Sequence, residues 1–186
     1  VDAAGILRRL GLGNTPLKSV MRRGALDVLP NVVAYWPVED ADGSTQIASG
    51  IAGGKPMSVT GEPGWAAASN IPSSAPFAAA EGSKWRGQIP AYTPASGDTV
   101  IRFLLTSTGS ITNGAVIFRA VTTGGVARHD VVYSTAGAGS LTLNTYNSAG
   151  TLFDSVGPTD VGLNAGRFWV DLGLDQSGTD VFTDLS

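Results

Sequence analysis

Two tryptophans in a loop-rich part of the sequence have the side chains best suited to hold a ligand. Trp65 occurs in Pro63-Gly64-Trp65, and Trp85 stands between Lys84 and Arg86. An exposed indole can stack on a sugar ring, and a neighbouring guanidinium can bind the hydroxyls or acidic groups of that sugar. The sequence therefore predicts Trp65, Trp85 and Arg86 as ligand-binding residues. The alternative is that both rings hold long loops onto the body of the domain.

A short acidic segment predicts a weak metal site. In Asp40-Ala41-Asp42-Gly43-Ser44, hard oxygen ligands alternate and a glycine permits a bend, as at the start of a calcium-binding loop. The third acid and the distant glutamate of an EF-hand are absent, and an acidic turn after a strand explains the segment equally well. Calcium at Asp40 and Asp42 is the one cofactor that the sequence suggests.

The residues needed for bond-breaking chemistry are scarce. The chain has no cysteine, and His129 is its single histidine. His129 lies in a strand-like pattern and is expected to make an ordinary structural hydrogen bond. The glutamates are Glu39, Glu62 and Glu81, too few and too widely spaced for the paired acids of a jelly-roll glucanase. The sequence therefore predicts a protein that is not an enzyme.

Composition and charge exclude several classes of partner. The first 24 residues carry five basic groups against one acid, whereas residues 25–186 carry seven basic and fourteen acidic groups. An acidic body disfavours nucleic acid, because phosphate contacts need lysine or arginine. No stretch reads as a membrane-spanning helix, so we expect no membrane partner. The basic leader is instead expected to pack against another chain or domain.

The distribution of apolar residues predicts a mostly β protein behind a helical leader, with residues 1–30 as the leader and 31–186 as the β domain. Two short helices are expected, around Ala3–Leu10 and from an N-cap at Thr15 to Gly24. The closely spaced later strands must be antiparallel, which indicates a two-sheet sandwich or jelly roll. The expected strands are Val32–Trp36, Met57–Thr60, Ser83–Ile89, Asp98–Ser107, Gly114–Thr122, Ala127–Ser134, Ser140–Tyr146, Thr151–Val156, Gly166–Leu174 and Asp180–Leu185.

Three motifs near the start of the chain resemble a known family. Asn31-Val32-Val33-Ala34-Tyr35-Trp36-Pro37-Val38-Glu39-Asp40 is similar to the opening of concanavalin A-like, laminin-G-like jelly rolls in minor tail proteins of actinobacterial phages and prophages. The segments 5–11 and 16–24 resemble the linker that joins such a domain to an upstream tail module. In related domains, further strands follow a Trp-x-x-Val type strand. Here only 16 residues follow Arg167-Phe168-Trp169-Val170, which predicts a sandwich that is incomplete at its C-terminus.

The resemblance implies a non-enzymatic structural or adhesion module of a phage tail, located in the virion. Such a module would present a lectin-like sandwich for recognition of a host-surface glycan, and its basic leader would bind other tail proteins or an upstream tail domain. A homotrimer is a further expectation of the resemblance. Two alternatives stay open: a secreted, extracellular carbohydrate-binding module, and a jelly-roll glycan hydrolase.

Overall fold

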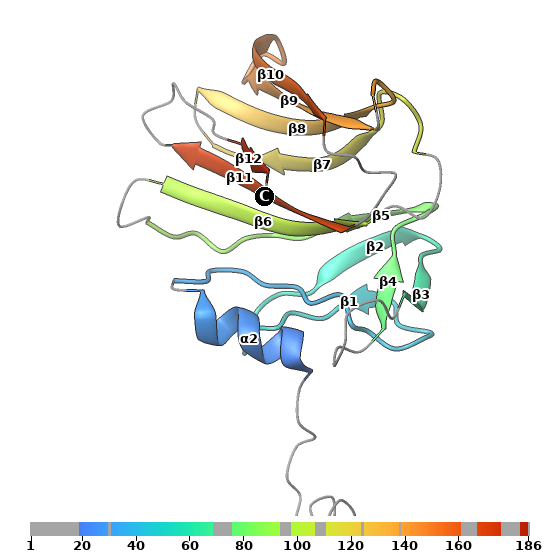
Figure 1. Ribbon diagram of the computed structural model, residues 1–186. Coiled ribbons are helices and arrows are strands. Elements are labelled where there is room, and N and C mark those ends of the chain that lie inside the picture. Colours follow the sequence, from blue (N-terminus) through green and yellow to red (C-terminus); the bar gives the residue numbers. More distant parts are fainter. Residues whose placement is uncertain are drawn as a thin grey trace, which may run out of the picture. The chain divides into compact units, whose positions relative to one another are not determined.

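In the computed structural model the regular structure is mostly antiparallel β-strand (Figure 1). It describes residues 19–29, 31–68, 76–93, 98–106, 111–123, 125–137, 139–160, 167–175 and 183–185. One helix lies within these residues, so the prediction of an all-β chain with little helix is confirmed. The chain divides into two compact units, unit 1 (residues 1–92) and unit 2 (residues 93–186).

Each unit contains two separate sheets, and every strand pair is antiparallel. Unit 1 has a sheet in the order β1-β2-β5 and the pair β3-β4, whereas unit 2 has the sheets β10-β9-β8-β7 and β12-β11-β6. The strands of unit 1 are β1 (Gln46–Ile47), β2 (Met57–Gly61), β3 (Gly64–Ala68), β4 (Phe77–Ala79) and β5 (Ser83–Arg86). Those of unit 2 are β6 (Asp98–Thr106), β7 (Val116–Val121), β8 (Val126–Ser134), β9 (Ser140–Asn147), β10 (Leu152–Asp160), β11 (Arg167–Asp175) and β12 (Thr183–Leu185).

The helix of unit 1, α2 (Val20–Val28), differs from the predicted leader helix. Its N-cap is Ser19, whose side chain accepts a hydrogen bond from the Arg22 amide, and the helix continues through Gly24 instead of ending there. The prediction of an end at Gly24 is wrong because the residues that follow are good helix formers, and the helix stops only before Pro30. The predicted helix at 3–10 and the predicted cap at Thr15 lie outside the described residues.

Helix α2 is fixed to the rest of unit 1 by hydrogen bonds from side chains. Ser19 Oγ donates to Glu39 Oε2 over 2.6 Å, and Arg22 Nη2 donates to the Ser49 carbonyl over 3.1 Å. The Tyr35 hydroxyl donates to the Met21 carbonyl over 3.1 Å. Burial, reinforced by the Glu39 carboxylate, raises the pKa of Tyr35, so its hydroxyl keeps the proton that this bond requires.

The segment Val32–Trp36 does not form the predicted strand. The Tyr35 carbonyl accepts a hydrogen bond from the Gly50 amide over 2.8 Å, and Trp36 Nε1 donates to the Lys55 carbonyl over 2.9 Å. Apolar and aromatic residues favour a strand, but a strand also needs a neighbour along its length. Here the segment is bound by loop residues instead, which corrects the prediction.

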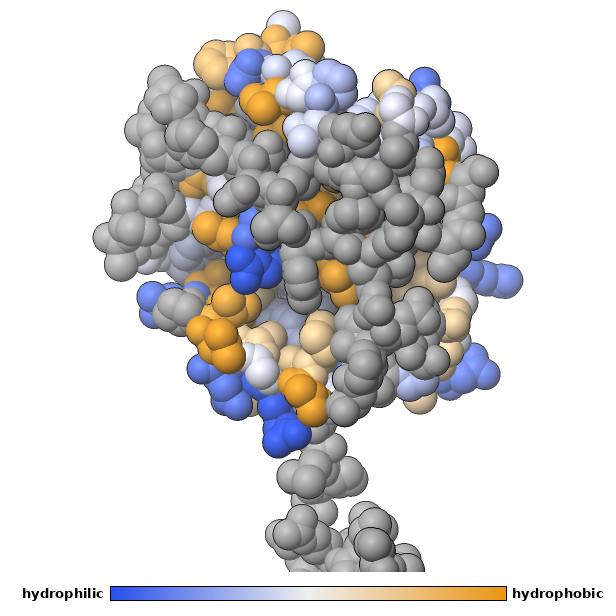
Figure 2. Space-filling view, in the orientation of Figure 1, coloured by the Kyte–Doolittle hydropathy of each residue, from blue (hydrophilic) through white to orange (hydrophobic). Residues whose placement is uncertain are grey.

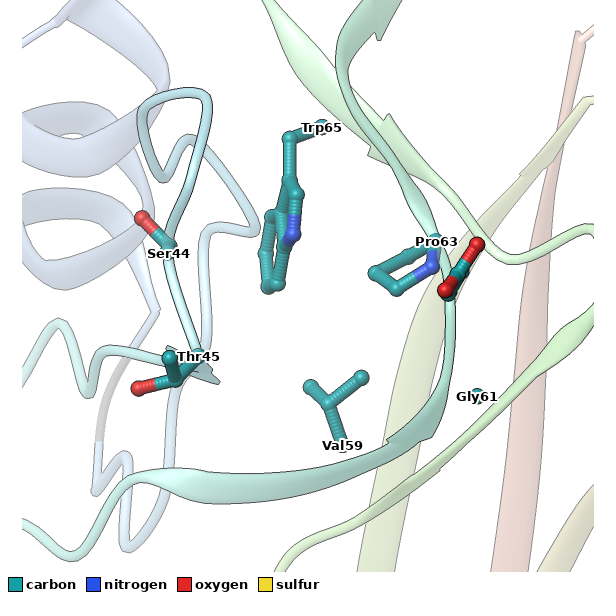
Figure 3. A pocket seen from close by; sticks show the side chains of 7 residues that line it. Ser44, Thr45, Val59, Gly61, Pro63 and Trp65 are labelled. Carbon is teal, nitrogen blue, oxygen red and sulfur yellow. The ribbon is translucent and has the colours of Figure 1, made fainter.

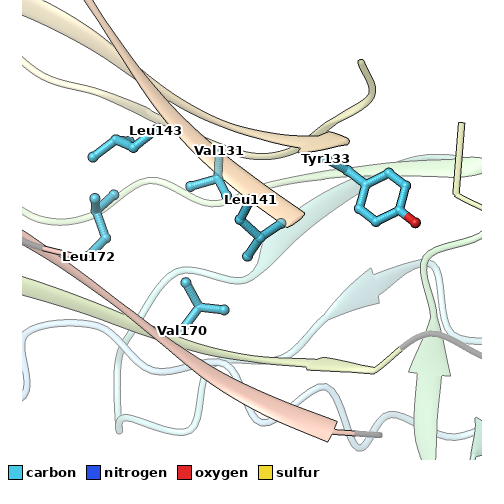
Figure 4. Close-up of a cluster of buried hydrophobic side chains, with 6 residues drawn as sticks. All are labelled: Val131, Tyr133, Leu141, Leu143, Val170 and Leu172. Carbon is cyan, nitrogen blue, oxygen red and sulfur yellow. The ribbon is translucent and has the colours of Figure 1, made fainter. Parts of the chain in front are cut away.

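Unit 2 encloses a hydrophobic core between its two sheets (Figure 4). The four-stranded sheet contributes Val131 and Tyr133 from β8 and Leu141 and Leu143 from β9, while Val170 and Leu172 come from β11. These six side chains are between 0% and 5% exposed. Phe103 of β6 stacks on Phe118 of β7 with ring centroids 4.7 Å apart, so the two layers also meet through aromatic rings.

The strands predicted in the second half of the sequence are confirmed, with every end within four residues of the predicted one. The alternation Phe168-x-Val170-x-Leu172-x-Leu174 falls on β11, where Val170 and Leu172 are buried. Alternation predicts these strands well because unit 2 buries only one face of each sheet, so the side-chain period of two is preserved in the sequence. In unit 1 the strands predicted near 57–60 and 83–89 are present as β2 and β5.

His129 gives unit 2 a pH dependence. It is 4% exposed, and its Nδ1 lies 3.4 Å from Thr145 Oγ1, which confirms the expected structural hydrogen bond. Burial lowers the pKa of His129 below 6.5, against a smaller raising effect of Asp130. Because the unfolded chain then binds more protons, we expect the free energy of unfolding to fall as the pH drops below about 6.5.

Urea unfolding of wild type and of His129→Gln at a series of pH values from 7.5 to 5 measures this effect. The wild type should lose more stability than the variant across this range, because glutamine does not titrate. Equal losses in the two proteins would assign the pH dependence to carboxylates and contradict the prediction.

Strand β10 forms an exposed edge of the four-stranded sheet. Leu152 and Phe153 are 52% and 60% exposed, and hydrophobic atoms lie at the surface where β10 is found, at the top of the view (Figure 2). Two register shifts interrupt its pairing with β9. Such irregularities on an edge strand hinder pairing with a foreign strand.

Candidate functional site

A pocket in unit 1 brings the predicted ligand-binding residue Trp65 together with polar side chains. It has a volume of about 360 Å³ and is lined by Ser44, Thr45, Val59, Gly61, Glu62, Pro63 and Trp65; these seven residues are called the Trp65 pocket below. Figure 3 shows the indole directed toward Val59, with Ser44 and Thr45 on one side and Pro63 on the other. The pocket therefore has an aromatic wall, an apolar floor and a polar rim.

One side of the Trp65 pocket is a turn that the predicted metal ligands stabilise. Asp40 Oδ1 accepts from the Ala48 amide over 3.0 Å, and Asp42 Oδ1 accepts from the Gly43 amide over 3.0 Å. Ser44 donates through both its amide and its hydroxyl to the Ala41 carbonyl. These bonds close a turn that carries Ser44 and Thr45 to the pocket.

The hydrogen bonds place Asp40 and Asp42 in a turn, and the metal site stays a prediction. Asp40 Oδ2 is buried without a hydrogen-bond partner, but in the described part of the chain no three histidine, cysteine, aspartate or glutamate side chains gather into a metal-binding group. Calcium needs six to eight oxygen ligands. Asp40 and Asp42 therefore act here on the shape of the loop.

The other side of the Trp65 pocket is the turn between β2 and β3. Gly61 has φ +90°, and a Cβ at this position would overlap the Gly82 carbonyl oxygen, so the tight approach of the two chain segments depends on glycine. Glu62 and Pro63 follow directly, and Trp65 is the second residue of β3. Ala66 has φ +51°, which is unusual for a residue other than glycine, and it lies in the register shift of the β3–β4 pair.

Neither of the other two predicted ligand-binding residues lines this pocket. Trp85 is on β5, directly opposite Val59 of β2, and is partly buried with no hydrogen-bond partner for its Nε1. Arg86, the next residue, is exposed, and successive strand residues point to opposite faces. The structure thus brings Trp65 into a pocket but separates Trp85 from Arg86.

The Trp65 pocket has side chains of the kinds that binding of a polyhydroxylated ring would require. The indole offers an apolar face for the C–H groups of a sugar, while Ser44, Thr45 and Glu62 offer oxygen atoms for its hydroxyls. Among these lining residues Glu62 is the only one with a carboxyl group. Glycoside hydrolysis by the usual route requires two carboxyl groups, and the lining residues supply one.

Sequence reasoning found Trp65 but missed its companions. From the sequence alone, Glu62 is only a possible partner of another acid, and Ser44 is only part of an acidic loop. One local signal was available: the run Gly61-Glu62-Pro63-Gly64 predicts a tight turn, which places Glu62 and Trp65 close together. The contribution of Ser44 and Thr45 depends on the pairing of β1 with β2, a long-range contact that has no local signal.

No protein-family model, curated protein or solved structure matches this chain. In the residues that the structure describes, no helix is both long and apolar enough to cross a membrane. The function of the chain therefore has to be inferred from its own surfaces, and first from the Trp65 pocket.

Proposed function

We propose that this chain is a non-enzymatic recognition module of a phage minor tail protein, and that it binds a host-surface glycan in the Trp65 pocket. The observation that carries the glycan-binding role is the indole of Trp65 set among the oxygen atoms of Ser44, Thr45 and Glu62. A tryptophan wall with a polar rim suits a pyranose, which has apolar C–H faces and hydroxyls around its edge.

The fold supports the same proposal. We propose that the chain is a variant of the concanavalin A-like jelly roll, because unit 2 packs two antiparallel sheets around one core and residues 31–40 resemble the opening of that family. Fold alone does not define function, since sandwich domains also serve as spacers. The tail location, the virion as compartment and the homotrimer follow from the resemblance and stay predictions.

The leader has a place in this proposal as the attachment to other tail proteins. Residues 1–18, with most of its basic groups, lie outside the described residues. Within α2, Val20 and Val28 are 51% and 77% exposed, which leaves apolar side chains available to a partner. Arg22, by contrast, binds the Ser49 carbonyl inside unit 1.

A glycan array followed by titration of the best ligand tests the proposed pocket. We expect Trp65→Ala to weaken binding roughly 30-fold, because truncation of a central aromatic anchor costs about 2 kcal/mol. Arg86→Ala is the control, because Arg86 is exposed, does not line the pocket and can be truncated with the interior left intact. Circular dichroism verifies that each variant is folded.

The control should keep affinity within about twofold of wild type. Equal affinity of wild type and Trp65→Ala would contradict the assignment of the site. Absence of any retained glycan would contradict the adhesion role and favour a scaffolding role. Release of reducing ends from a bound glycan would contradict the prediction that the chain is not an enzyme.

A further inference from the structure

The outward face of the four-stranded sheet in unit 2 carries a continuous row of polar side chains. In the strand register Arg119 of β7 stands opposite Asp130 of β8, Asp130 opposite Asn144 of β9, and Asn144 opposite Ser155 of β10. The neighbouring residue Val131 is 3% exposed and belongs to the core. Because successive side chains of a strand alternate between faces, the row lies on the face turned away from the core.

Asp130 is almost fully buried although it lies on this outward face. Its exposure is 2%, and its two carboxylate oxygens accept from Arg119 Nε over 2.6 Å and from Arg119 Nη2 over 2.8 Å. Arg128 Nε lies 3.4 Å from Asp130 Oδ2. A bidentate arginine pair has a fixed geometry, so the buried carboxylate holds the Arg119 guanidinium in place and helps to hold Arg128.

Arg128 is also held by an aromatic ring. Its guanidinium carbon lies 3.8 Å from the centroid of the Tyr146 ring, and Tyr146 is the residue opposite Arg128 in the register of β8 and β9. The side chains of Arg119 and Arg128 stay 48% and 33% exposed. Two oriented guanidinium groups are thus accessible to solvent above one buried carboxylate.

The free nitrogens of Arg119, Arg128 and Asn144 are all hydrogen-bond donors. Asn144 Oδ1 already accepts from Ser155 Oγ over 2.8 Å, so its Nδ2 is the free end of that amide. Within the described residues no hydrogen bond uses the terminal nitrogens of Arg128 or Nη1 of Arg119. Two positive charges against one negative charge give this row a local excess of one positive charge on an otherwise acidic body.

We propose that Arg119, Arg128 and Asn144 form a second binding site, which takes an oxyanion carried on a polyhydroxylated polymer. A carboxylate or a phosphate would bind the guanidinium donors, which match its geometry, and Asn144 would donate to a third oxygen or a hydroxyl. Exposed Val121 and Leu152 flank the Arg128–Tyr146 pair in the register and suit the apolar parts of such a chain. The site lies in unit 2 and is separate from the Trp65 pocket.

A second ion pair of the same unit shows what a purely structural pair looks like. On the three-stranded sheet Arg102 of β6 binds Asp171 of β11 through two hydrogen bonds, directly opposite each other in the register. Asp171 is less buried than Asp130, with a side chain 22% exposed, and the described residues place no second arginine on it. Arg102 and Asp171 cancel each other's charge. Replacement of Arg102 removes one positive charge, as replacement of Arg128 does, and therefore serves as the control.

The test is calorimetric titration of the full chain with three oligomers: a uronic acid oligomer, a polyol-phosphate oligomer and a neutral hexose oligomer. We expect binding of at least one of the two anionic oligomers, weakened by added salt, and no binding of the neutral one at this site. Uronic acid binding alone would identify a carboxylate ligand, and polyol-phosphate binding alone would identify a phosphodiester. Either outcome, or binding of both anionic oligomers, supports an oxyanion site.

Arg128→Gln should weaken anion binding about tenfold or more, because a charge-assisted hydrogen bond is lost while the Arg119–Asp130 pair stays intact. Arg128→Lys keeps the charge but not the fork and should be intermediate. Arg102→Gln, which removes the same charge from the other sheet, should change affinity less than about twofold. Thermal melts verify that the variants are folded.

Three results would overturn the proposal. Binding of neither anionic oligomer would leave the row as a structural ion-pair network only. An equal loss in Arg128→Gln and Arg102→Gln would indicate unspecific attraction to total charge. Loss of anion binding in Trp65→Ala would place the anion in the Trp65 pocket instead of on this sheet.

Discussion

Replacement of Leu172 by alanine is expected to lower the free energy of unfolding of unit 2 by about 2–5 kcal/mol. Leu172 is 0% exposed and lies between the two sheets of the core (Figure 4). Truncation removes its buried methyl groups and leaves a cavity that the surrounding strands can close only in part. Urea unfolding monitored by circular dichroism measures the change.

Leu152→Ala is the matched control, because it deletes the same atoms from a side chain that is 52% exposed on β10. Its effect should stay within about 0.5 kcal/mol. If the two variants lost similar amounts of stability, the core of unit 2 would not be where the structure has it.

Gly61→Ala is expected to have the second largest effect, on both stability and ligand binding. The residue has φ +90°, a conformation that costs a residue with a side chain about 1–3 kcal/mol, and the new Cβ would also overlap the Gly82 carbonyl oxygen. Because Gly61 lines the Trp65 pocket and precedes Glu62, the turn has to shift. We therefore expect a lower melting temperature together with weaker glycan binding.

Gly53→Ala separates these two contributions, because Gly53 has φ +74° and nothing lies within 4 Å of a Cβ added there. This variant bears the conformational cost without the overlap and lies outside the Trp65 pocket. It should destabilise the protein less than Gly61→Ala and leave the affinity for glycan unchanged. Equal melting temperatures for the two variants would contradict the role of the Gly82 contact.

The sequence predicted the strands of unit 2 because their apolar and polar residues alternate as the buried and exposed faces of the sheets do. Val170 and Leu172 alternate with the more exposed Asp171, as expected when one face of a sheet is buried. The same reasoning failed at Val32–Trp36, where β-branched and aromatic residues pack without a neighbouring strand. Gly50, whose amide binds the Tyr35 carbonyl, is far along the sequence, and no local pattern announces it.

The two candidate sites also differ in how much of them the local sequence predicts. Trp65 could be predicted because an indole between turn residues is unusual in any setting. The row on the four-stranded sheet could not, because Arg119, Asp130 and Asn144 meet only through the register of three strands. Alternation indicates which side chains share a face within one strand, but it leaves open which residue of the next strand stands opposite.

The order of the strands in unit 2 has a consequence for how the chain acquires its structure during synthesis. Strands β7 to β10 each pair with the next along the chain, so this part can assemble through short loop closures. Strand β6 instead pairs with β11, whose first residue is about 60 positions beyond the end of β6. Until the ribosome has released β11, Ile101, Phe103 and Leu105 lack their sheet partner, and in that interval the nascent chain is most exposed to aggregation and to chaperones.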